Sequence, residues 1–297
     1  MKLLIISGRS GSGKSTALNM LEDHGYYCID NLPASLLPSL VERISQQDID
    51  VPRIAVSIDA RNIAIDLKRV PDIIRDLEPS RIVTEVVFLD ANGPTLIKRF
   101  SESRRKHPLT GPEVGLREAI NRERELLEPI SRLAGLAIDT SNMSVHQLRD
   151  SIRQRIVEKK DNTMALMFES FGFKNGVPID ADIVFDVRCL PNPYWEAELR
   201  GLTGLDTEIR KFLSAHAEVN EMLEDIKVFL EKWLPRFEAS NRSYITIGIG
   251  CTGGQHRSVY ISEGLKAHFA SQFTNVQSMH RELYQSRQKV GAGDAQG

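Results

Sequence analysis

A glycine-rich segment near the start of the chain constrains the fold more than any other feature. Residues Gly8–Ser15 read GRSGSGKS and fit the pattern G-x-x-x-x-G-K-[ST]. The apolar run Lys2–Ser7 precedes them with the length of a strand, and Ser15–His24 follows with helical periodicity. A strand, a glycine loop and a helix in this order present backbone N–H groups and a positive helix end to an anion. The sequence therefore predicts a phosphate-binding loop in an α/β fold.

The residue types in this loop suit the phosphates and metal of a nucleotide. Lys14 would neutralise the β- and γ-phosphates, and the Ser15 hydroxyl would ligate Mg²⁺. The alternative is a glycine-rich turn without a ligand, and the position between a strand and a helix argues against it. The predicted nucleotide-binding residues of the loop are Gly8, Arg9, Ser10, Gly11, Ser12, Gly13, Lys14 and Ser15.

An acid that would support Mg²⁺ is harder to assign. Asp30, Asp59 and Asp90 each follow a predicted strand, and ligands bind open α/β sheets at the carboxyl ends of strands. Each of the three also fits a role as a helix cap or turn residue. Asp59 is preferred because Arg61 and Asn62 follow it and offer further contacts.

Short apolar strands alternate with amphipathic helices along the first half of the chain, which indicates parallel βαβ units. The charged stretch Lys159–Asn162 interrupts this alternation, and a new strand, Met164–Glu169, starts after it. The prediction is an α/β protein with two domains. Residues 1–160 form an N-terminal P-loop NTPase domain with a nucleotide-kinase-like parallel sheet, and 161–297 form a second α/β domain with its own phosphate-binding loop. Expected helices in these domains include Ala64–Leu77, Val145–Lys159 and a long stretch, Glu208–Leu234.

Basic residues follow the predicted helix Pro94–Ser103. Arg104, Arg105 and Lys106 lie where small P-loop kinases have a basic lid over the phosphates. The helix arginines that follow, Arg117, Arg122 and Arg124, are weaker candidates. Glu118 and Arg122 are four residues apart and can pair on a solvated face.

A second strand–loop–helix unit lies at residues 243–266. Its loop contains Gly253 and Gly254, and Cys251, Arg257 and Ser258 satisfy C-x5-R-[ST], the pattern of cysteine-dependent phosphatases. One interpretation is catalysis by Cys251 with an acid such as Asp182 or Asp186. The favoured one is binding of a phosphorylated metabolite, and a buried cysteine beside a turn is the remaining alternative.

Polar residues between 170 and 192 could complete this second pocket, although Asp182 and Arg188 could equally form a structural ion pair. The candidate substrate-binding residues are Lys174, Asp182, Arg188, Asn192, Cys251, Thr252, Gly253, Gly254, His256 and Arg257.

Bulk composition excludes several classes of protein. A net charge of −2 gives no strong single-sign field for nucleic acid or membranes. Three widely separated cysteines without a CxxC pair argue against a disulfide framework and a zinc site. No signal peptide and no apolar stretch that could span a bilayer is visible, so a cytoplasmic location is expected.

The two halves together resemble the RapZ family of RNase adapters and YvcJ-like nucleotide-binding proteins. The resemblance rests on GRSGSGKSTAL, CIDNLP, RRKHPL and IDTS in the first half. In the second half it rests on SFGFKNGVPIDAD, FDVRCLPNPYW and GCTGGQHRSVY.

This resemblance implies a domain that binds ATP and GTP and hydrolyses both slowly. It places ATP at Gly8–Ser15 and GTP at Asp59, Ala60, Arg61 and Asn62. It further implies a second domain that senses glucosamine-6-phosphate, a small regulatory RNA and an endoribonuclease as partners, and a homo-oligomer.

The carboxyl-terminal tail departs from the enteric members of that family, which end in a strongly basic segment. Residues Arg257–Gly297 contain five Lys or Arg and three Asp or Glu. Phosphate contacts dominate RNA affinity, so this composition weakens the case for RNA, although Arg281, Arg287 and Lys289 remain on a plausible helix. A regulatory adapter is therefore the first hypothesis for the function, and a P-loop kinase of a small metabolite is the alternative.

Overall fold

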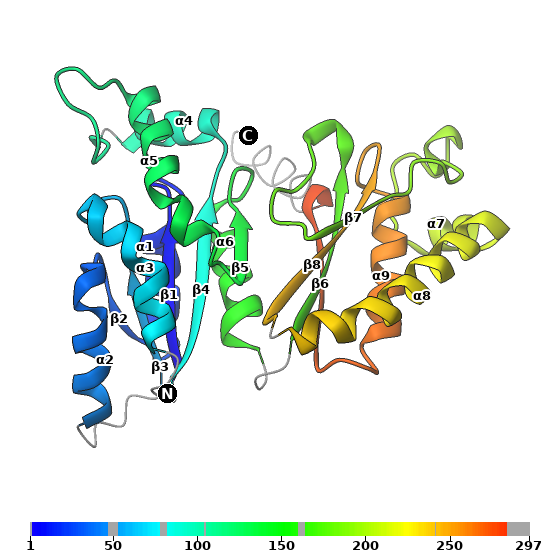
Figure 1. Ribbon diagram of the computed structural model, residues 1–297. Coiled ribbons are helices and arrows are strands. Elements are labelled where there is room, and N and C mark those ends of the chain that lie inside the picture. The colour runs from blue at the N-terminus through cyan, green and yellow to red at the C-terminus, as the bar shows by residue number, and fades with distance from the viewer. Residues whose placement is uncertain are drawn as a thin grey trace. The chain divides into compact units, whose positions relative to one another are not determined.

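The computed structural model describes residues 2–46, 53–77, 82–103, 105–159, 164–240 and 242–283 (Figure 1). The chain divides into two compact units, Met1–Lys159 and Lys160–Gly297. The sequence boundary after residue 160 falls next to this division. Arg104, Arg287, Lys289 and the tail Gly291–Gly297 lie outside the described residues.

A five-stranded parallel sheet forms the centre of the first unit. Its strands are β1 (Lys2–Gly8), β2 (Tyr27–Ile29), β3 (Arg53–Ser57), β4 (Val83–Asp90) and β5 (Leu136–Asp139), in the order β2-β3-β1-β4-β5. The central strand β1 is apolar along its length because both of its faces are covered, as expected for a parallel sheet. All five carboxyl ends meet at one edge, where β1 pairs Gly8 with Leu89 of β4.

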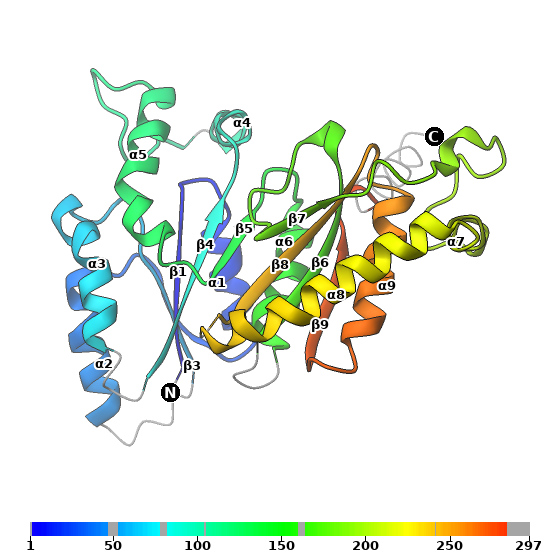
Figure 2. The same ribbon diagram turned by 45° about the vertical axis from the view of Figure 1, so that its right-hand side comes forward.

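Helices cover both faces of this sheet (Figures 1 and 2). On one face α1 (Lys14–Glu22) packs against α6 (Val145–Ile152), and on the other α3 (Ala64–Leu77) packs against α5 (Leu116–Ser131). The remaining helical elements are η1 (Ala34–Leu36), α2 (Leu37–Gln46), α4 (Gly93–Ser103) and η3 (Arg153–Val157). The prediction for α3 matches its observed bounds. The single helix expected over Val145–Lys159 instead changes to a π-helical turn at Arg153.

The second unit has a four-stranded parallel sheet. Its strands are β6 (Ala165–Gly172), β7 (Ile183–Asp186), β8 (Tyr244–Cys251) and β9 (Asn275–His280), in the order β7-β8-β6-β9. Sequence reasoning missed β9, an edge strand whose residues NVQSMH are mostly polar and half-buried. The helical elements are η4 (Phe173–Asn175), η5 (Pro193–Trp195), α7 (Thr207–Ser214), α8 (Ala217–Ala239) and α9 (Arg257–Phe269).

The long helix expected over Glu208–Leu234 is wrong as a single element. The chain breaks between α7 and α8, where His216 is extended with φ −97° and ψ 124°. The Asn220 side-chain amide donates to the carbonyl oxygens of Ser214, at 3.0 Å, and His216, at 3.2 Å. The bond to Ser214 satisfies a carbonyl group that a continuous helix would have satisfied with its own backbone, while His216 also accepts from the backbone N–H of Val219. In the part of the chain that the structure describes, no helix is long and apolar enough to cross a membrane.

Candidate functional site

Three glycines shape the loop that joins β1 to α1. Gly8, Gly11 and Gly13 have φ of 143°, 85° and 107°, which side-chain-bearing residues rarely adopt. A Cβ on Gly8 would lie 2.0 Å from the carbonyl oxygen of Leu89, and one on Gly13 would lie 2.4 Å from Leu148 Cδ2. Gly8 is therefore excluded from carrying a side chain by the neighbouring backbone, whereas Gly13 is constrained mainly by its positive φ, because the leucine side chain could move aside.

Lys14 lies across the inside of this loop. Its Nζ donates to the carbonyl oxygens of Gly8, at 2.7 Å, and Arg9, at 3.3 Å, and is 3.9 Å from Asp59 Oδ2. Burial lowers the pKa of Lys14, while the charges of Asp59 and Glu123 oppose that shift. The ammonium group is therefore directed into the cradle formed by the loop, as the motif predicts.

Asp59 is the acid that the structure places beside this lysine. Burial by itself raises its pKa, but hydrogen bonds from Arg61 and the charge of Lys14 outweigh burial and hold the pKa below its usual value. The Arg61 side chain donates to Asp59 through Nε and through Nη2, the latter at 2.8 Å. Asp59 thus remains a carboxylate at neutral pH.

A metal site at Ser15 and Asp59 is consistent with these positions. Mg²⁺ bound to a nucleotide needs only one or two protein oxygens, because phosphates and waters supply the rest. Ser15 is exposed at the start of α1, and both residues line the same cavity. Asp30 also lines it, whereas Asp90 accepts from Arg9 Nε at 2.6 Å and lines a separate cavity of about 610 Å³ that includes Arg124.

The cavity at the phosphate loop has a volume of about 650 Å³, which suits a small-molecule ligand. Arg61, Arg99, Arg105 and Lys106 add positive charge to that of Lys14, against the carboxylates Asp30 and Asp59. Its lining residues are Ser10, Gly11, Gly13, Lys14, Ser15, Asp30, Asp59, Arg61, Arg99, Phe100, Ser103, Arg105, Lys106 and Pro108. The predicted lid residues Arg105 and Lys106 are therefore part of the site, while Arg122 pairs with Glu118 on the surface as the alternative predicted.

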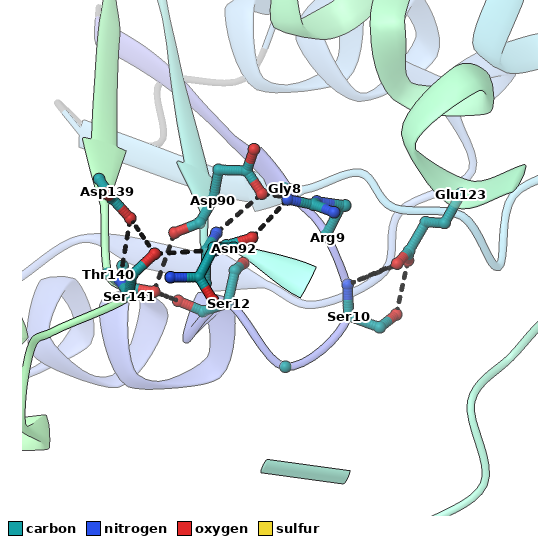
Figure 3. A network of polar contacts seen from close by, with 12 residues as sticks. Gly8, Arg9, Ser10, Ser12, Asp90, Asn92, Glu123, Asp139, Thr140 and Ser141 are labelled. Atoms are coloured by element: carbon teal, nitrogen blue, oxygen red, sulfur yellow. Dashed lines mark hydrogen bonds and ion pairs between the residues drawn. The ribbon is translucent and has the colours of Figure 1, made fainter. Parts of the chain in front are cut away.

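Side chains from distant segments hold the loop from outside (Figure 3). Arg9 also bonds the carbonyl oxygen of Ala91, and Glu123 accepts from the backbone N–H of Ser10 at 3.0 Å. Thr140 Oγ1 lies 2.9 Å from the carbonyl oxygen of Ser12.

Arg99 adds a further contact to this loop, because its Nη1 donates to the carbonyl oxygen of Gly11 at 2.9 Å. Sequence reasoning assigned no role to Arg99, Glu123 or Thr140. Only the segment IDTS, which carried part of the family resemblance, pointed toward Thr140.

The residues Asp59, Ala60, Arg61 and Asn62 do not share one environment. Asp59 and Arg61 face the cavity, but Ala60 is buried. Asn62 Oδ1 accepts from the backbone N–H of Ala34 at 2.7 Å, which fixes the start of η1. The structure thus brings two of these four residues to the cavity.

The second candidate loop follows β8 and ends at α9. Gly254 has φ 72°, and its backbone N–H donates to Cys251 Sγ at 3.1 Å. Ser258 Oγ also lies 3.1 Å from that sulfur, and Cys251 is 3% exposed. The thiol therefore points into the protein and organises the turn.

Arg257 holds a neighbouring loop in place. Its Nη1 donates to the carbonyl oxygens of Arg188, at 2.7 Å, and Leu190, at 2.8 Å, and its Nη2 donates to Thr252 Oγ1 at 3.2 Å. The backbone N–H of Lys174 donates to the carbonyl oxygen of Thr252 at 3.4 Å. Lys174, Arg188 and the Cys251–Arg257 loop are thereby gathered at the carboxyl ends of β6, β7 and β8.

Two other candidates of the second pocket have local structural roles. His256 Nε2 donates to the carbonyl oxygen of Leu202 at 2.7 Å, and burial lowers the pKa of this histidine. Asn192 Oδ1 accepts from the backbone N–H of Tyr194 at the start of η5.

Asp182 does not belong to this group, so its assignment to the second pocket is wrong, and the alternative pairing of Asp182 with Arg188 is wrong as well. Asp182 precedes β7, so it lies at the amino-terminal end of the parallel sheet, where it accepts from the backbone N–H of Thr246 and pairs with Arg242 at 2.5 Å. Arg188 instead pairs with Asp186 at 2.6 Å, and this bond lowers the pKa of Asp186. Asp182 cannot reach Arg188 because the strand β7 lies between them and places them at opposite ends of the sheet. Asp186 and Arg188 lie in the same turn and can pair.

Family models match both units of the chain. A RapZ-like N-terminal domain matches residues 1–160, and a RapZ C-terminal domain matches residues 164–284. The chain belongs to the RapZ family. This membership confirms the resemblance that the motifs of both halves indicated.

Curated relatives of this RapZ-family chain are similar over nearly its whole length. A protein of Hahella chejuensis named "Nucleotide-binding protein" is 57% identical and covers 96% of this chain and 100% of its own length. Pseudomonas fluorescens (strain Pf0-1) has "Nucleotide-binding protein Pfl01_0854", which is 55% identical over 95% of this chain and 100% of its own.

Solved structures of kinases resemble about half of the chain. A shikimate kinase from Bacteroides thetaiotaomicron is 13% identical, covers 53% of this chain and 98% of its own, and has a TM-score of 0.37. A gluconokinase from Sinorhizobium meliloti is 18% identical, covers 51% of this chain and 89% of its own, and has a TM-score of 0.35. The P-loop fold of the first unit is established here by its strand order and by the Gly8–Ser15 loop.

Proposed function

We propose that this RapZ-family chain is a regulatory protein with two phosphate sites. The first unit binds ATP and GTP with Mg²⁺, and the second binds glucosamine-6-phosphate. The observation that carries the proposal is the position of Lys14, whose ammonium group lies inside the glycine loop, in a cavity also lined by Arg61, Arg99, Arg105 and Lys106. Nucleotide binding agrees with the names of the curated relatives.

Slow hydrolysis agrees with the acids at this cavity. An efficient general base has a pKa near the working pH, so that it can accept a proton from water. Asp59 instead has a lowered pKa and is bonded by Arg61. Asp30, the other lining carboxylate, accepts from Ser57 Oγ at 2.6 Å. These contacts favour binding and sensing over rapid turnover.

The second site is supported by a similar backbone geometry. The turn at Gly254 leads into the 13-residue helix α9, whose N-terminus favours an anion. Thr252 and Lys174 are exposed beside the loop and offer a hydroxyl and an ammonium group to a sugar phosphate. Cys251 is buried, which favours binding over the cysteine-phosphatase alternative.

Thermal stability against ligand concentration tests both sites. A ligand at 100 times its Kd adds about 2.7 kcal/mol to the stability of the state that binds it. ATP and GTP should raise the melting temperature of the wild type but not of Lys14→Ala. Lys98→Ala, which removes an exposed lysine of α4, is the matched control and should respond as the wild type does.

Glucosamine-6-phosphate should stabilise Lys14→Ala fully but Lys174→Gln and Arg257→Ala less. Cys251→Ser should retain this response, because the sulfur faces the interior. The absence of a shift with any sugar phosphate would exclude the second site, and the absence of one with either nucleotide would exclude the first.

The adapter role adds a small regulatory RNA and an endoribonuclease as partners of a cytoplasmic homo-oligomer. Arg281 is the last Lys or Arg of the described residues, but its side chain is only 13% exposed, pairs with Glu282 and donates to the carbonyl oxygen of Gly176 at 2.7 Å. RNA binding would therefore depend on other cations. A salt titration of RNA affinity tests this role, since phosphate contacts make affinity fall as salt rises. A flat response would reject it.

A small-molecule kinase is the alternative function, and the lining of the cavity by Arg105 and Lys106 favours it. Transfer of the γ-phosphate of ATP to an added metabolite, at a rate above that of hydrolysis, would establish the kinase instead of the regulator.

A further inference from the structure

A buried carboxylate and a buried histidine connect the phosphate loop to the basic segment that follows α4. The side chains of Glu123, in α5, and His107 are both 0% exposed, and Glu123 Oε2 lies 2.9 Å from His107 Nε2. Glu123 also accepts from the backbone N–H of Ser10 at 3.0 Å and from Ser10 Oγ at 2.7 Å. The cost of burying this charge is offset because every one of these partners is a donor.

The hydrogen bonds of His107 define which ring nitrogen holds the proton. Nδ1 accepts from the backbone N–H of Leu109 at 3.2 Å, so the proton is on Nε2 and is donated to Glu123. Glu123 therefore accepts from both Ser10 and His107. The charge of Glu123 raises the pKa of Lys14 against the effect of burial.

An apolar contact runs parallel to this polar one. The ring of Phe100 lies 5.1 Å from the ring of His107, centroid to centroid. Phe100 Cε2 would also be 3.5 Å from a Cβ placed on Gly11, so the Phe100 ring lies next to the phosphate loop. His107 is thus linked to the loop by its bond to Glu123, and its other neighbour, Phe100, lies next to the same loop.

The chain around His107 presents the cations of the cavity. Arg105 and Lys106 immediately precede this anchored histidine and line the cavity with Lys14. The carbonyl oxygen of His107 accepts from the backbone N–H of Thr110 at 3.0 Å and from its hydroxyl at 2.7 Å. A displacement of His107 would therefore displace both cations.

We propose that Glu123 and His107 are positioning residues that hold Arg105 and Lys106 in register with the phosphate loop. The loop and Lys14 serve the β- and γ-phosphates, and the two positioned cations add further charge at the outermost phosphate of a nucleoside triphosphate, which a diphosphate lacks. The inference rests on the proposed nucleotide function. It adds a prediction about the preference for triphosphate over diphosphate.

Titration calorimetry with ATP and with ADP, both with Mg²⁺, measures this preference. His107→Phe keeps the ring contact with Phe100 but removes the bond to Glu123. We expect it to weaken ATP binding about tenfold, the factor for roughly 1.4 kcal/mol, and ADP binding less than threefold. His107→Gln, whose amide can donate to Glu123, should restore most of the ATP affinity, and His146→Phe, at an exposed position of α6, is the control.

Two further variants separate positioning from folding. Arg105→Gln with Lys106→Gln changes only exposed side chains and should reproduce the selective loss of ATP affinity. Glu123→Gln should weaken both nucleotides, because an amide cannot accept from the backbone N–H of Ser10, the Ser10 hydroxyl and His107 as the carboxylate does, so the loop loses part of its support. Glu118→Gln, an exposed carboxylate of the same helix, should change neither affinity.

An equal loss of ATP and ADP affinity in His107→Phe, or an unchanged ATP affinity in the doubly substituted variant, would overturn the inference and leave nucleotide binding intact. A wild type that binds neither nucleotide would overturn the proposed function and this inference with it.

Discussion

The loops at Gly8–Ser15 and Cys251–Arg257 have the same local order of strand, turn and helix. Their basic residues, Lys14 and Arg257, differ in what they bind. Lys14 donates to carbonyl oxygens of its own loop and lies beside a carboxylate, at the wall of a cavity lined by other cations. Arg257 is 3% exposed and donates to the carbonyl oxygens of Arg188 and Leu190, which belong to a different loop.

Because of this difference, we expect substitution of Lys14 to affect ligand binding and substitution of Arg257 to affect stability. Substitution of Lys14 removes a charge at the wall of the cavity, whereas substitution of Arg257 removes the group that holds a neighbouring loop. The strand–glycine loop–helix motif alone therefore does not predict whether its basic residue binds a ligand or stabilises the fold.

Gly8 of the first loop and Gly253 of the second should give the largest contrast. Gly8→Ala places a Cβ against the Leu89 carbonyl oxygen at a φ of 143°, and we expect it to cost at least about 4 kcal/mol of stability in the first unit. Gly253→Ala meets no atom within 4 Å and should change stability by less than about 1 kcal/mol. Circular dichroism during urea unfolding measures both, and equal effects would show that these two positions are equally crowded.

The arginine of the second loop should give the next largest effect. Arg257→Ala leaves one buried and one part-buried carbonyl oxygen without a charged donor, which should cost about 3 kcal/mol. In Arg257→Lys, the ammonium group can replace only some of the hydrogen bonds of the guanidinium, so this variant should recover less than half of the lost stability. The control is Arg242→Ala, whose exposed pair with Asp182 should be worth less than about 1 kcal/mol. Tryptophan fluorescence reports these changes, because Trp195 and Trp233 are the two tryptophans of the chain and both lie in the second unit.

A fall in pH should lower the free energy of unfolding of the second unit by less than the Gly8 and Arg257 substitutions lower it. Burial lowers the pKa values of His256 and His280 from the ordinary 6.5. The unfolded chain therefore binds more protons than the folded chain as the pH falls through 6.5. The free energy of unfolding should decrease from pH 7 to pH 5.5, by at most about 1.4 kcal/mol for each unit of pKa difference. Urea unfolding followed by tryptophan fluorescence tests this, and His256→Gln should flatten the slope; a stability that rises in acid would contradict the prediction.

Local patterns predicted much of the architecture and the centre of the first site. The bounds of α3 follow from periodicity, and the residues of the phosphate loop follow from a motif whose members are adjacent in sequence. The polar edge strand β9 was missed because its residues lack the apolar alternation of a half-buried strand.

The partners of the loops could not be predicted in the same way. Glu123 reaches Ser10 across 113 residues, and no spacing rule connects two positions so far apart. The pairing of Asp182 with Arg188 failed for the opposite reason: the two are close in sequence, but an intervening strand places them at opposite ends of a sheet.

The contacts that hold the first phosphate loop also have a consequence for synthesis of the chain. The loop is synthesised before its partner Thr140, which follows Ser12 by 128 residues. At typical elongation rates of about 5–20 residues per second, that interval is on the order of 6 to 25 s. Until the interval ends, the nascent loop lacks at least one of the side chains that hold its shape. Competence to hold a phosphate should therefore appear well after the motif itself has been translated.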